Sequence, residues 1–290
     1  METIIIILLS LIIEFLYEPI KKFRNEDIFK RIYDLYNSYY KLYLENKAFS
    51  YISCSIIIVI FITIIINIVA FIHPLLSFVT TLLILLFCFS PNEFNQKIED
   101  FKFIIENDQN IEKSDILQEI APNLKKINLK NNLLESISKS LFFNSTRNIF
   151  NILFWFLLLG AGGALGYRIL DTFAYTSTIK IDQKSRIDIK KILGIIEFIP
   201  IRLSIYAFAV VGNFENALQS LKTTTTSTDI YQSNVELITN VGEASSRLPH
   251  TGEEENVWNN KISYIQTLIA RALLAWLSII LLLVFGGFFI

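Results

Sequence analysis

The sequence predicts an all-α fold: a polytopic helical membrane protein with four to six transmembrane helices and a small cytoplasmic helical module. The 290 residues are 52% hydrophobic, and their mean hydropathy is +0.47, too high for a soluble domain of this size. Apolar runs such as Tyr51–Phe71 reach the ~20 residues that span a hydrocarbon core. The 24 Phe and 12 Tyr residues are typical of lipid contact and interfacial belts.

Composition also excludes several function classes. The 26 basic and 27 acidic residues nearly balance, so nucleic acid is not expected as a partner. Two cysteines, Cys54 and Cys88, predict neither a disulfide framework nor a metal site. No HExxH, CxxC, GxSxG or Walker lysine is present. We therefore assign no catalytic residue and no metal ligand, and the lipid bilayer is the one partner that composition indicates.

Residues 1–90 are predicted to form the N-terminal membrane helices. The first, Thr3–Tyr17, is expected to be a retained helix rather than a cleaved signal, because no basic region precedes it and no small-residue cleavage site follows. Residues 18–49 predict an amphipathic helix with a tyrosine stripe, lying either along the headgroups or against another helix. Residues 51–89 predict a helical hairpin broken at His73-Pro74.

Residues 91–147 predict a cytoplasmic helical module with helices over 92–107, 114–120 and 129–143. Residues 148–290 then predict a C-terminal membrane region that includes a polar loop, 213–262, in which 231–241 could form one short helix. At about 55 residues, the module is too small to bury much core alone.

The stretch Arg147–Asp171 is the centre of the chain. It is apolar from Asn148 to Tyr167 except for two asparagines and a cluster of glycines. Gly162 and Gly166 are four residues apart and share a helix face, so they predict close approach of a second helix. The glycine spacing does not fit a dinucleotide-binding fingerprint, and the preceding run is helix-length.

Lys and Arg counts predict that the N-terminus lies outside. Segments 18–50, 91–147 and 213–262 then hold 7, 8 and 3 basic residues inside, against 6 in the outer segment 168–191. The six basic residues of the outer segment conflict with this orientation, because Lys and Arg are expected inside. The conflict disappears if residues 148–175 enter the membrane and return at the glycines, or if the first segment does not span.

Six polar side chains at the edges of the C-terminal apolar segments are the candidate ligand-binding residues. Two charges flanking a proline in 192–212 are costly in hydrocarbon. Two interpretations stay open, since guanidiniums and acids near a membrane surface could bind an anionic ligand or merely neutralise one another. The candidates are Arg147, Arg168, Asp171, Glu197, Arg202 and Asn213.

Two sequence blocks carry a family resemblance. NILFWFLLLGAGGALGYRILDTF (151–173) and FIPIRLSIYAFAVVGNFENAL (198–218) resemble the AmpE / CobD–CbiB superfamily of bacterial inner-membrane proteins. The CobD–CbiB branch resembles adenosylcobinamide-phosphate synthases, which are ATP- and magnesium-dependent ligases. That branch carries acids that this chain lacks after Glu135-Ser136 and at Ala174, so the chain is more similar to the AmpE branch.

The AmpE resemblance implies an inner-membrane signalling or accessory protein, linked to β-lactamase induction and cell-wall recycling, with no turnover. The alternative is a CobD/CbiB-like ligase of cobalamin biosynthesis. Whether the protein is an enzyme therefore stays open, and the resemblance favours a protein without enzyme activity. No cofactor is expected, and ATP and magnesium belong only to the alternative. The resemblance also implies a multi-pass protein of the bacterial inner (cytoplasmic) membrane, a cytosolic or membrane protein partner, and a cell-wall fragment or corrinoid as ligand.

Overall fold

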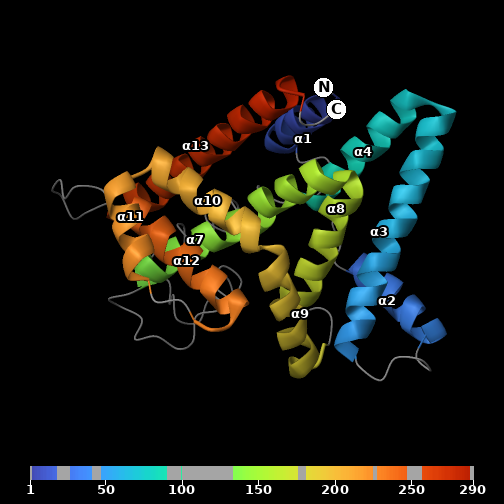
Figure 1. Cartoon of the computed structure of the whole chain (residues 1–290), viewed down its shortest axis with the longest axis horizontal. Helices are drawn as coiled ribbons and strands as arrows, with labels where there is room; N and C mark the ends of the chain where they lie inside the picture. The colour runs from blue at the N-terminus through green and yellow to red at the C-terminus, as the bar shows by residue number, and fades with distance from the viewer. Residues whose placement is uncertain are drawn as a thin grey trace. The chain divides into compact units, whose positions relative to one another are not determined.

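The computed structural model of the protein is mainly helical in the residues that it describes and has no strand among them, which confirms the predicted all-α class (Figure 1). These residues are 2–17, 27–40, 47–89, 99, 133–175, 181–224, 227–246 and 257–287. They fall into two compact units. Unit 1 comprises Met1–Phe89, Asn151–Phe198 and Asp229–Tyr231, and unit 2 comprises Ser90–Phe150, Ile199–Thr228 and Gln232–Ile290.

Unit 1 is built around a helical hairpin. Its helices are α1 (Glu2–Tyr17), α2 (Asp27–Tyr40), α3 (Lys47–Ile72), α4 (Pro74–Cys88), α8 (Asn151–Tyr175) and α9 (Gln183–Ile196). His73 separates α3 from α4, and its Nδ1 accepts a hydrogen bond from the backbone N–H of Leu75 at 3.1 Å. Pro74 suits the first turn of α4, where a backbone N–H has no helical acceptor. Helix α3 also packs on α8 and α9, while α4 packs on α1 and α8.

Helix α2 packs on another helix, which is one of the two interpretations of its tyrosine stripe. The ring of Tyr33 stacks on that of Tyr51 in α3, with centroids 4.0 Å apart. The Tyr36 hydroxyl lies 2.8 Å from the Ser53 hydroxyl, also in α3. Tyr43 lies outside the described residues. Tyr33 and Tyr36 therefore hold α2 against the N-terminal part of α3.

Helix α8 bends sharply at Gly160, which has φ 65° and ψ −156°. This backbone conformation is open essentially to glycine alone. After the bend, Gly162 and Gly166 face α3. A Cβ on Gly162 would lie 2.5 Å from the Thr63 hydroxyl, and one on Gly166 would lie 2.6 Å from a Val59 methyl. The predicted close approach of a second helix at these glycines is confirmed, and that helix is α3.

Unit 2 contains α7 (Leu133–Ser145), the π-helical turn η3 (Thr146–Phe150), α10 (Phe198–Val211, all but its first residue), α11 (Phe214–Thr223), α12 (Ile230–Ser245, mainly from Gln232) and α13 (Val257–Phe285). Its core is aromatic. The Phe208 ring lies 5.1 Å from Phe142 and 5.5 Å from Phe150, and Phe150 lies 5.5 Å from Trp276. Gly242 of α12 packs against the Phe142 ring, where no Cβ would fit.

The polar segment 213–262 is more regular than the sequence suggests. It contains the helices α11 and α12, whereas the prediction was a loop with at most one short helix over 231–241. Polar composition misled the prediction, because α11 buries only Ala217 and α12 buries polar as well as apolar residues. Of the predicted module 91–147, the helices over 92–107 and 114–120 lie outside the described residues, apart from residue 99. The third corresponds to α7.

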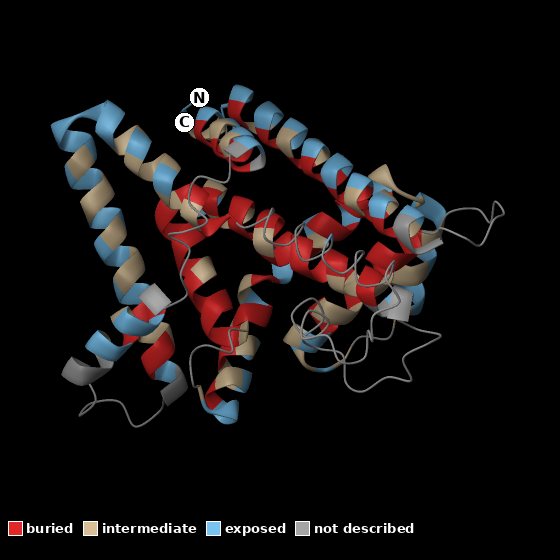
Figure 2. Ribbon diagram, turned by 180° about the vertical axis from the view of Figure 1, so that it is seen from behind, coloured by how far each residue is buried: buried red, intermediate tan, exposed pale blue. Residues whose placement is uncertain are grey.

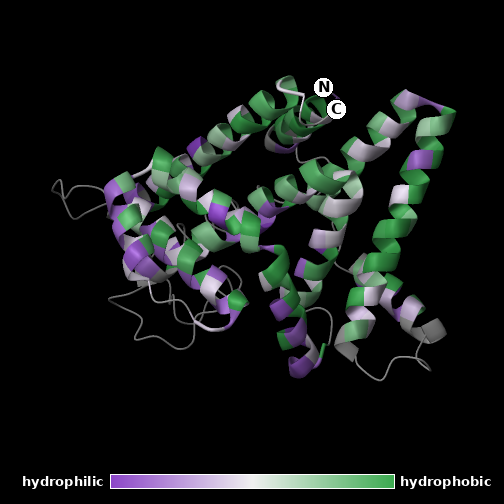
Figure 3. Ribbon diagram, in the orientation of Figure 1, coloured by the Kyte–Doolittle hydropathy of each residue, from purple (hydrophilic) through white to green (hydrophobic). Residues whose placement is uncertain are grey.

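Three described helical stretches are long and apolar enough to cross a membrane: Phe49–Ile72, Ile137–Tyr175 and Asn260–Phe285. Helices α9 and α10 add a fourth if the pair, broken at Glu197, counts as one span. Hydrophobic residues run along α3, α4 and α13, and hydrophilic ones gather on α11 and α12 (Figure 3). The protein is a helical membrane protein with three to four candidate spans in the described part of the chain.

Candidate functional site

A network of polar side chains lies buried within unit 1. The Tyr167 hydroxyl donates to Oε1 of Glu197 at 2.7 Å. The Asn151 side-chain amide donates to the same oxygen at 3.0 Å and to the Tyr167 hydroxyl at 2.9 Å. Asn151 and Glu197 are 0% exposed, and Tyr167 is 3% exposed. The three groups hydrogen-bond one another and are almost fully buried, although Oδ1 of Asn151 and Oε2 of Glu197 accept no hydrogen bond from the described residues.

The bend at Gly160 allows the side chains of this network to meet. Asn151 and Tyr167 are 16 residues apart, which on a straight helix would separate them by about 24 Å. Their side chains nevertheless meet at 2.9 Å. The two halves of α8 must therefore fold back towards each other, and Figure 1 shows them running in different directions from the bend. Glu197 joins them from the C-terminal end of α9, where it follows Ile196.

The network lies where the chain passes between the units. Asn151 is the first residue of unit 1 after Phe150, and Glu197 precedes the passage from Phe198 to Ile199. Asn151 also directly follows the π-helical turn η3, a feature that often marks functional sites in helices. One set of hydrogen bonds thus links two points at which the chain leaves and enters unit 1.

The network leaves some polar atoms of α8 unsatisfied in the part of the chain that the structure describes. Oδ1 of Asn151 is buried and accepts no hydrogen bond, and Nε1 of Trp155, one turn further on, donates none. A buried group without a partner costs about 1–3 kcal/mol. Buried polar atoms without hydrogen bonds are more common at functional sites than in an ordinary core.

Two of the other predicted site residues in unit 1 pair with each other. Arg168 Nη1 lies 3.5 Å from Asp171 Oδ2, one helical turn away in α8. The Asp171 side chain is 2% exposed and that of Arg168 is 17% exposed. The neutralising interpretation of this pair therefore has direct geometric support. The hydroxyl of Thr172 completes the turn by donating to the Arg168 carbonyl at 2.8 Å.

The remaining predicted site residues belong to unit 2 and have local partners. Arg202 donates to Oδ1 of Asn234 in α12 at 3.0 Å. Asn213 begins α11, where its Oδ1 accepts the backbone N–H of Asn216 at 3.0 Å, as an N-cap does. Arg147 donates to Oδ1 of Asn144 at 3.2 Å. A common site of Arg168 and Asp171 with Arg202 and Asn213 stays a prediction, since these residues fall in two units.

Sequence reasoning identified Glu197 but missed Asn151 and Tyr167. Asn151 was a detectable signal, because an amide in a long apolar run must find a partner. Tyr167 was not, because its reach to Asn151 depends on the direction of the bend at Gly160. Among the described residues, no three His, Cys, Asp or Glu side chains are grouped as metal ligands.

A family model described as regulatory signalling modulator protein AmpE matches residues 2–288. The chain belongs to the AmpE family. The match extends over both units and includes Asn151, Tyr167 and Glu197. It confirms the AmpE resemblance of the two sequence blocks, which lie in α8 and in α10–α11. Searches of curated proteins and of solved structures found no match to this AmpE family member.

Proposed function

We propose that this AmpE family protein is a signalling modulator of the bacterial inner membrane that acts in β-lactamase induction and cell-wall recycling without turning over a substrate. The family membership supports the regulatory role, and the apolar helices support a membrane location. The observation that carries the proposal is the network of Asn151, Tyr167 and Glu197, whose buried side chains hydrogen-bond one another. A catalytic carboxylate needs access to its substrate, and this one has none in the described arrangement.

The network is suited to transmit a conformational change. Asn151 and Glu197 flank two passages of the chain between the units. Breaking either hydrogen bond to Glu197 Oε1 would free one passage to move relative to the other. A two-state element of this kind can be biased by a ligand or a protein partner bound elsewhere. The signal would then be a change in how the units are connected, with no chemical step.

The test uses a host with an inducible β-lactamase whose own copy of this gene is deleted. Wild type, Asn151→Ala, Tyr167→Phe and Glu197→Gln are each expressed, and β-lactamase activity is measured with and without a β-lactam inducer. We expect the network variants to change the induced activity several-fold. Glu215→Gln, an exposed acid-to-amide change in α11, should leave it unchanged.

A second control separates signalling from stability. Leu85→Ala removes a fully buried side chain of α4 and should cost about 2–5 kcal/mol, at a residue outside the network. The membrane level and the Tm of each variant are measured in parallel. Equal induction by wild type and by network variants present at wild-type levels would refute the proposal. So would changes that merely track the Tm loss of Leu85→Ala.

A further inference from the structure

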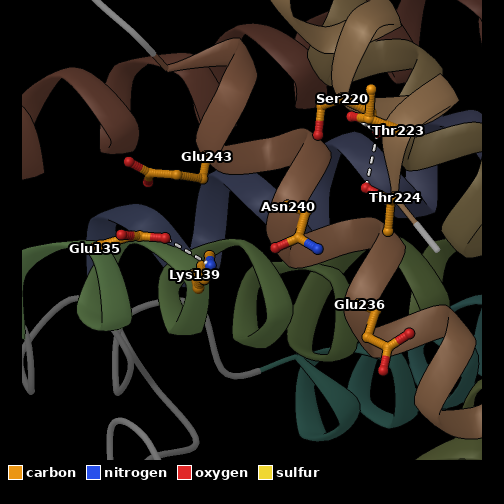
Figure 4. Close-up of a pocket in the computed structure, with 8 residues that line it drawn as sticks. All are labelled: Glu135, Lys139, Ser220, Thr223, Thr224, Glu236, Asn240 and Glu243. Atoms are coloured by element: carbon orange, nitrogen blue, oxygen red, sulfur yellow. Dashed lines mark hydrogen bonds and ion pairs between the residues drawn. The ribbon is translucent and has the colours of Figure 1, made fainter. Parts of the chain in front are cut away.

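A polar pocket of ≈ 500 Å³ lies in unit 2, among α7, α11 and α12. Its volume is in the range of small-molecule sites, about 300–1,000 Å³. Helix α7 contributes Glu135 and Lys139, α12 contributes Glu236, Asn240 and Glu243, and the end of α11 contributes three hydroxyl residues: Ser220, Thr223 and Thr224. Figure 4 shows these side chains coming from three different helices, with Asn240 in their midst.

The walls of the pocket are held in place by the core of unit 2. Gly242 packs against Phe142, so α12 lies close to α7. The backbone N–H of Asn213, which caps α11, donates to the carbonyl of Ser245 near the end of α12 at 2.9 Å. These contacts fix α11 and α7 against the same helix. The hollow is therefore a feature of the packing and not of one side-chain rotamer.

The two threonine hydroxyl groups of the pocket are oriented as acceptors. The Thr224 hydroxyl donates to the carbonyl of Ser220 at 2.7 Å, and that of Thr223 donates to the carbonyl of Gln219 at 3.0 Å. A hydroxyl has one proton, so each of these oxygens has only lone pairs left for a ligand. The side chains at this wall thus offer hydrogen-bond acceptors to whatever occupies the pocket.

The charges of the pocket are acidic on balance. Lys139 is paired with Glu135 at 2.7 Å, and Glu243 forms an ion pair with Lys261. Glu236 accepts the backbone N–H of Ser227 at 3.2 Å. Glu243 is 7% exposed, and its Oε2 accepts no hydrogen bond from the described residues. A buried carboxylate oxygen of this kind is costly unless a donor reaches it.

We propose that this pocket binds a small organic amine. Of the three carboxylates that line the pocket, Glu135 pairs with Lys139 and Glu243 pairs with Lys261, which leaves the charge of Glu236 for a ligand among the described residues. The threonine hydroxyls have only acceptor capacity towards that ligand. An ammonium group has three donors and no acceptor, so it complements this lining. A carboxylate or phosphate ligand would meet repulsion from the same groups. The inference concerns unit 2 alone and stands apart from the role proposed for the network in unit 1.

The test uses the purified full-length protein in an uncharged detergent, so that lipid phosphates take up no amine. Spermidine is titrated by calorimetry, with fully N-acetylated spermidine and Mg²⁺ as comparisons. We expect saturable binding of one spermidine per chain, and no matching signal from the acetylated compound or from Mg²⁺. The Glu236→Gln variant should raise the Kd by about ten- to hundredfold, which is the loss of affinity expected for a charge-assisted hydrogen bond.

Two further variants keep the result interpretable. Thr224→Val preserves shape but removes an acceptor and should also weaken binding. Glu215→Gln removes an exposed acid outside the pocket and should bind as wild type does. Absence of binding at millimolar spermidine would overturn the proposal. Equal binding by wild type and Glu236→Gln, equal loss in Glu215→Gln, or equal binding of Mg²⁺ would each overturn it as well.

Discussion

Helices α3 and α8 have nearly the same length, 26 and 25 residues, and both are apolar. Nevertheless, α3 is mostly exposed and α8 is mostly buried. In the most apolar window of α3 only 6% of residues are buried, whereas in the corresponding window of the stretch 137–175 the share is 67%. Figure 2 shows the same contrast, with α3 mainly exposed or intermediate and α8 mainly buried. The length of an apolar run therefore does not decide whether it contacts lipid or forms the core.

The difference arises from glycine. Helix α3 contains none, while α8 contains four, at Gly160, Gly162, Gly163 and Gly166. Gly160 permits the bend, and Gly162 and Gly166 let α3 approach closely. Gly163 packs against the preceding turn, with a Cβ position 2.6 Å from Leu159 Cβ. The non-helical conformation of Gly160 interrupts α8, and this bend is what lets the side chain of Asn151 meet that of Tyr167.

The largest effect is expected from filling the contact between the two helices. The double variant Gly162→Leu/Gly166→Leu forces side chains into Val59 and Thr63, and overpacking costs about 1–3 kcal/mol per site. We expect little monodisperse protein after detergent extraction, measured by size-exclusion chromatography. Ala70→Leu, on the exposed face of α3, is the matched control and should behave as wild type. A double variant with normal yield and Tm would show that the helices do not pack this closely.

The next effect concerns the bend itself. Gly160→Ala meets no atom within 4 Å, so its cost is purely that of the backbone conformation, about 1–3 kcal/mol. We expect a Tm loss together with altered near-UV circular dichroism from the aromatic residues of α8. Gly287→Ala also has positive φ and open surroundings, but it follows α13 and should perturb unit 1 little. A Gly160→Ala variant that matches wild type in both measurements would refute the bend.

A smaller effect is expected from one hydroxyl. Tyr167→Phe removes the shorter hydrogen bond to Glu197 and leaves a buried acceptor less satisfied, at a cost of about 1–3 kcal/mol. The measurement is the free energy of unfolding in detergent. Tyr206→Phe is the control, because Tyr206 is 56% exposed and surface changes stay within about 0.5 kcal/mol. Equal values for the two variants would mean that the network does not stabilise unit 1.

The smallest effect on stability is expected from single cysteine substitutions that test the membrane topology. If α8 returns at Gly160 and the broken pair of α9 and α10 also returns, the segments 18–50, 91–147, 168–191 and 213–262 share one side. Those segments hold 24 of the 26 Lys and Arg residues, which agrees with the positive-inside rule. This arrangement removes the conflict created by six basic residues outside.

Single cysteines test this arrangement in intact cells. We expect Lys184→Cys and Lys222→Cys to be protected from a membrane-impermeant thiol reagent, and Phe71→Cys, at the tip of the hairpin and 94% exposed, to react. The native Cys54 and Cys88 are buried and free, and the wild type measures their background. Labelling of Lys184→Cys together with Phe71→Cys would show that α8 crosses the membrane instead of returning.

Local patterns predicted part of the site. Glu197 was identified because a carboxylate in an apolar segment is costly and therefore conspicuous. The glycine contact followed from the four-residue spacing of Gly162 and Gly166. The pocket of unit 2 could not be predicted, because its lining comes from three helices, and two of them lie in a segment whose sequence predicts a polar loop with at most one short helix, over 231–241. Thr224 becomes an acceptor only through its bond to Ser220, which no sequence pattern reveals.

The sequence by itself determined the all-α membrane class, the helical hairpin at His73 and the glycine face of α8, because apolar run length, proline and residue spacing act locally. Only the tertiary structure decided where the polar side chains meet. The Asn151–Tyr167–Glu197 network and the acceptor-lined pocket depend on directions set by one glycine φ angle and by helix packing. Such directions are global, since a change of one torsion angle moves every atom beyond it.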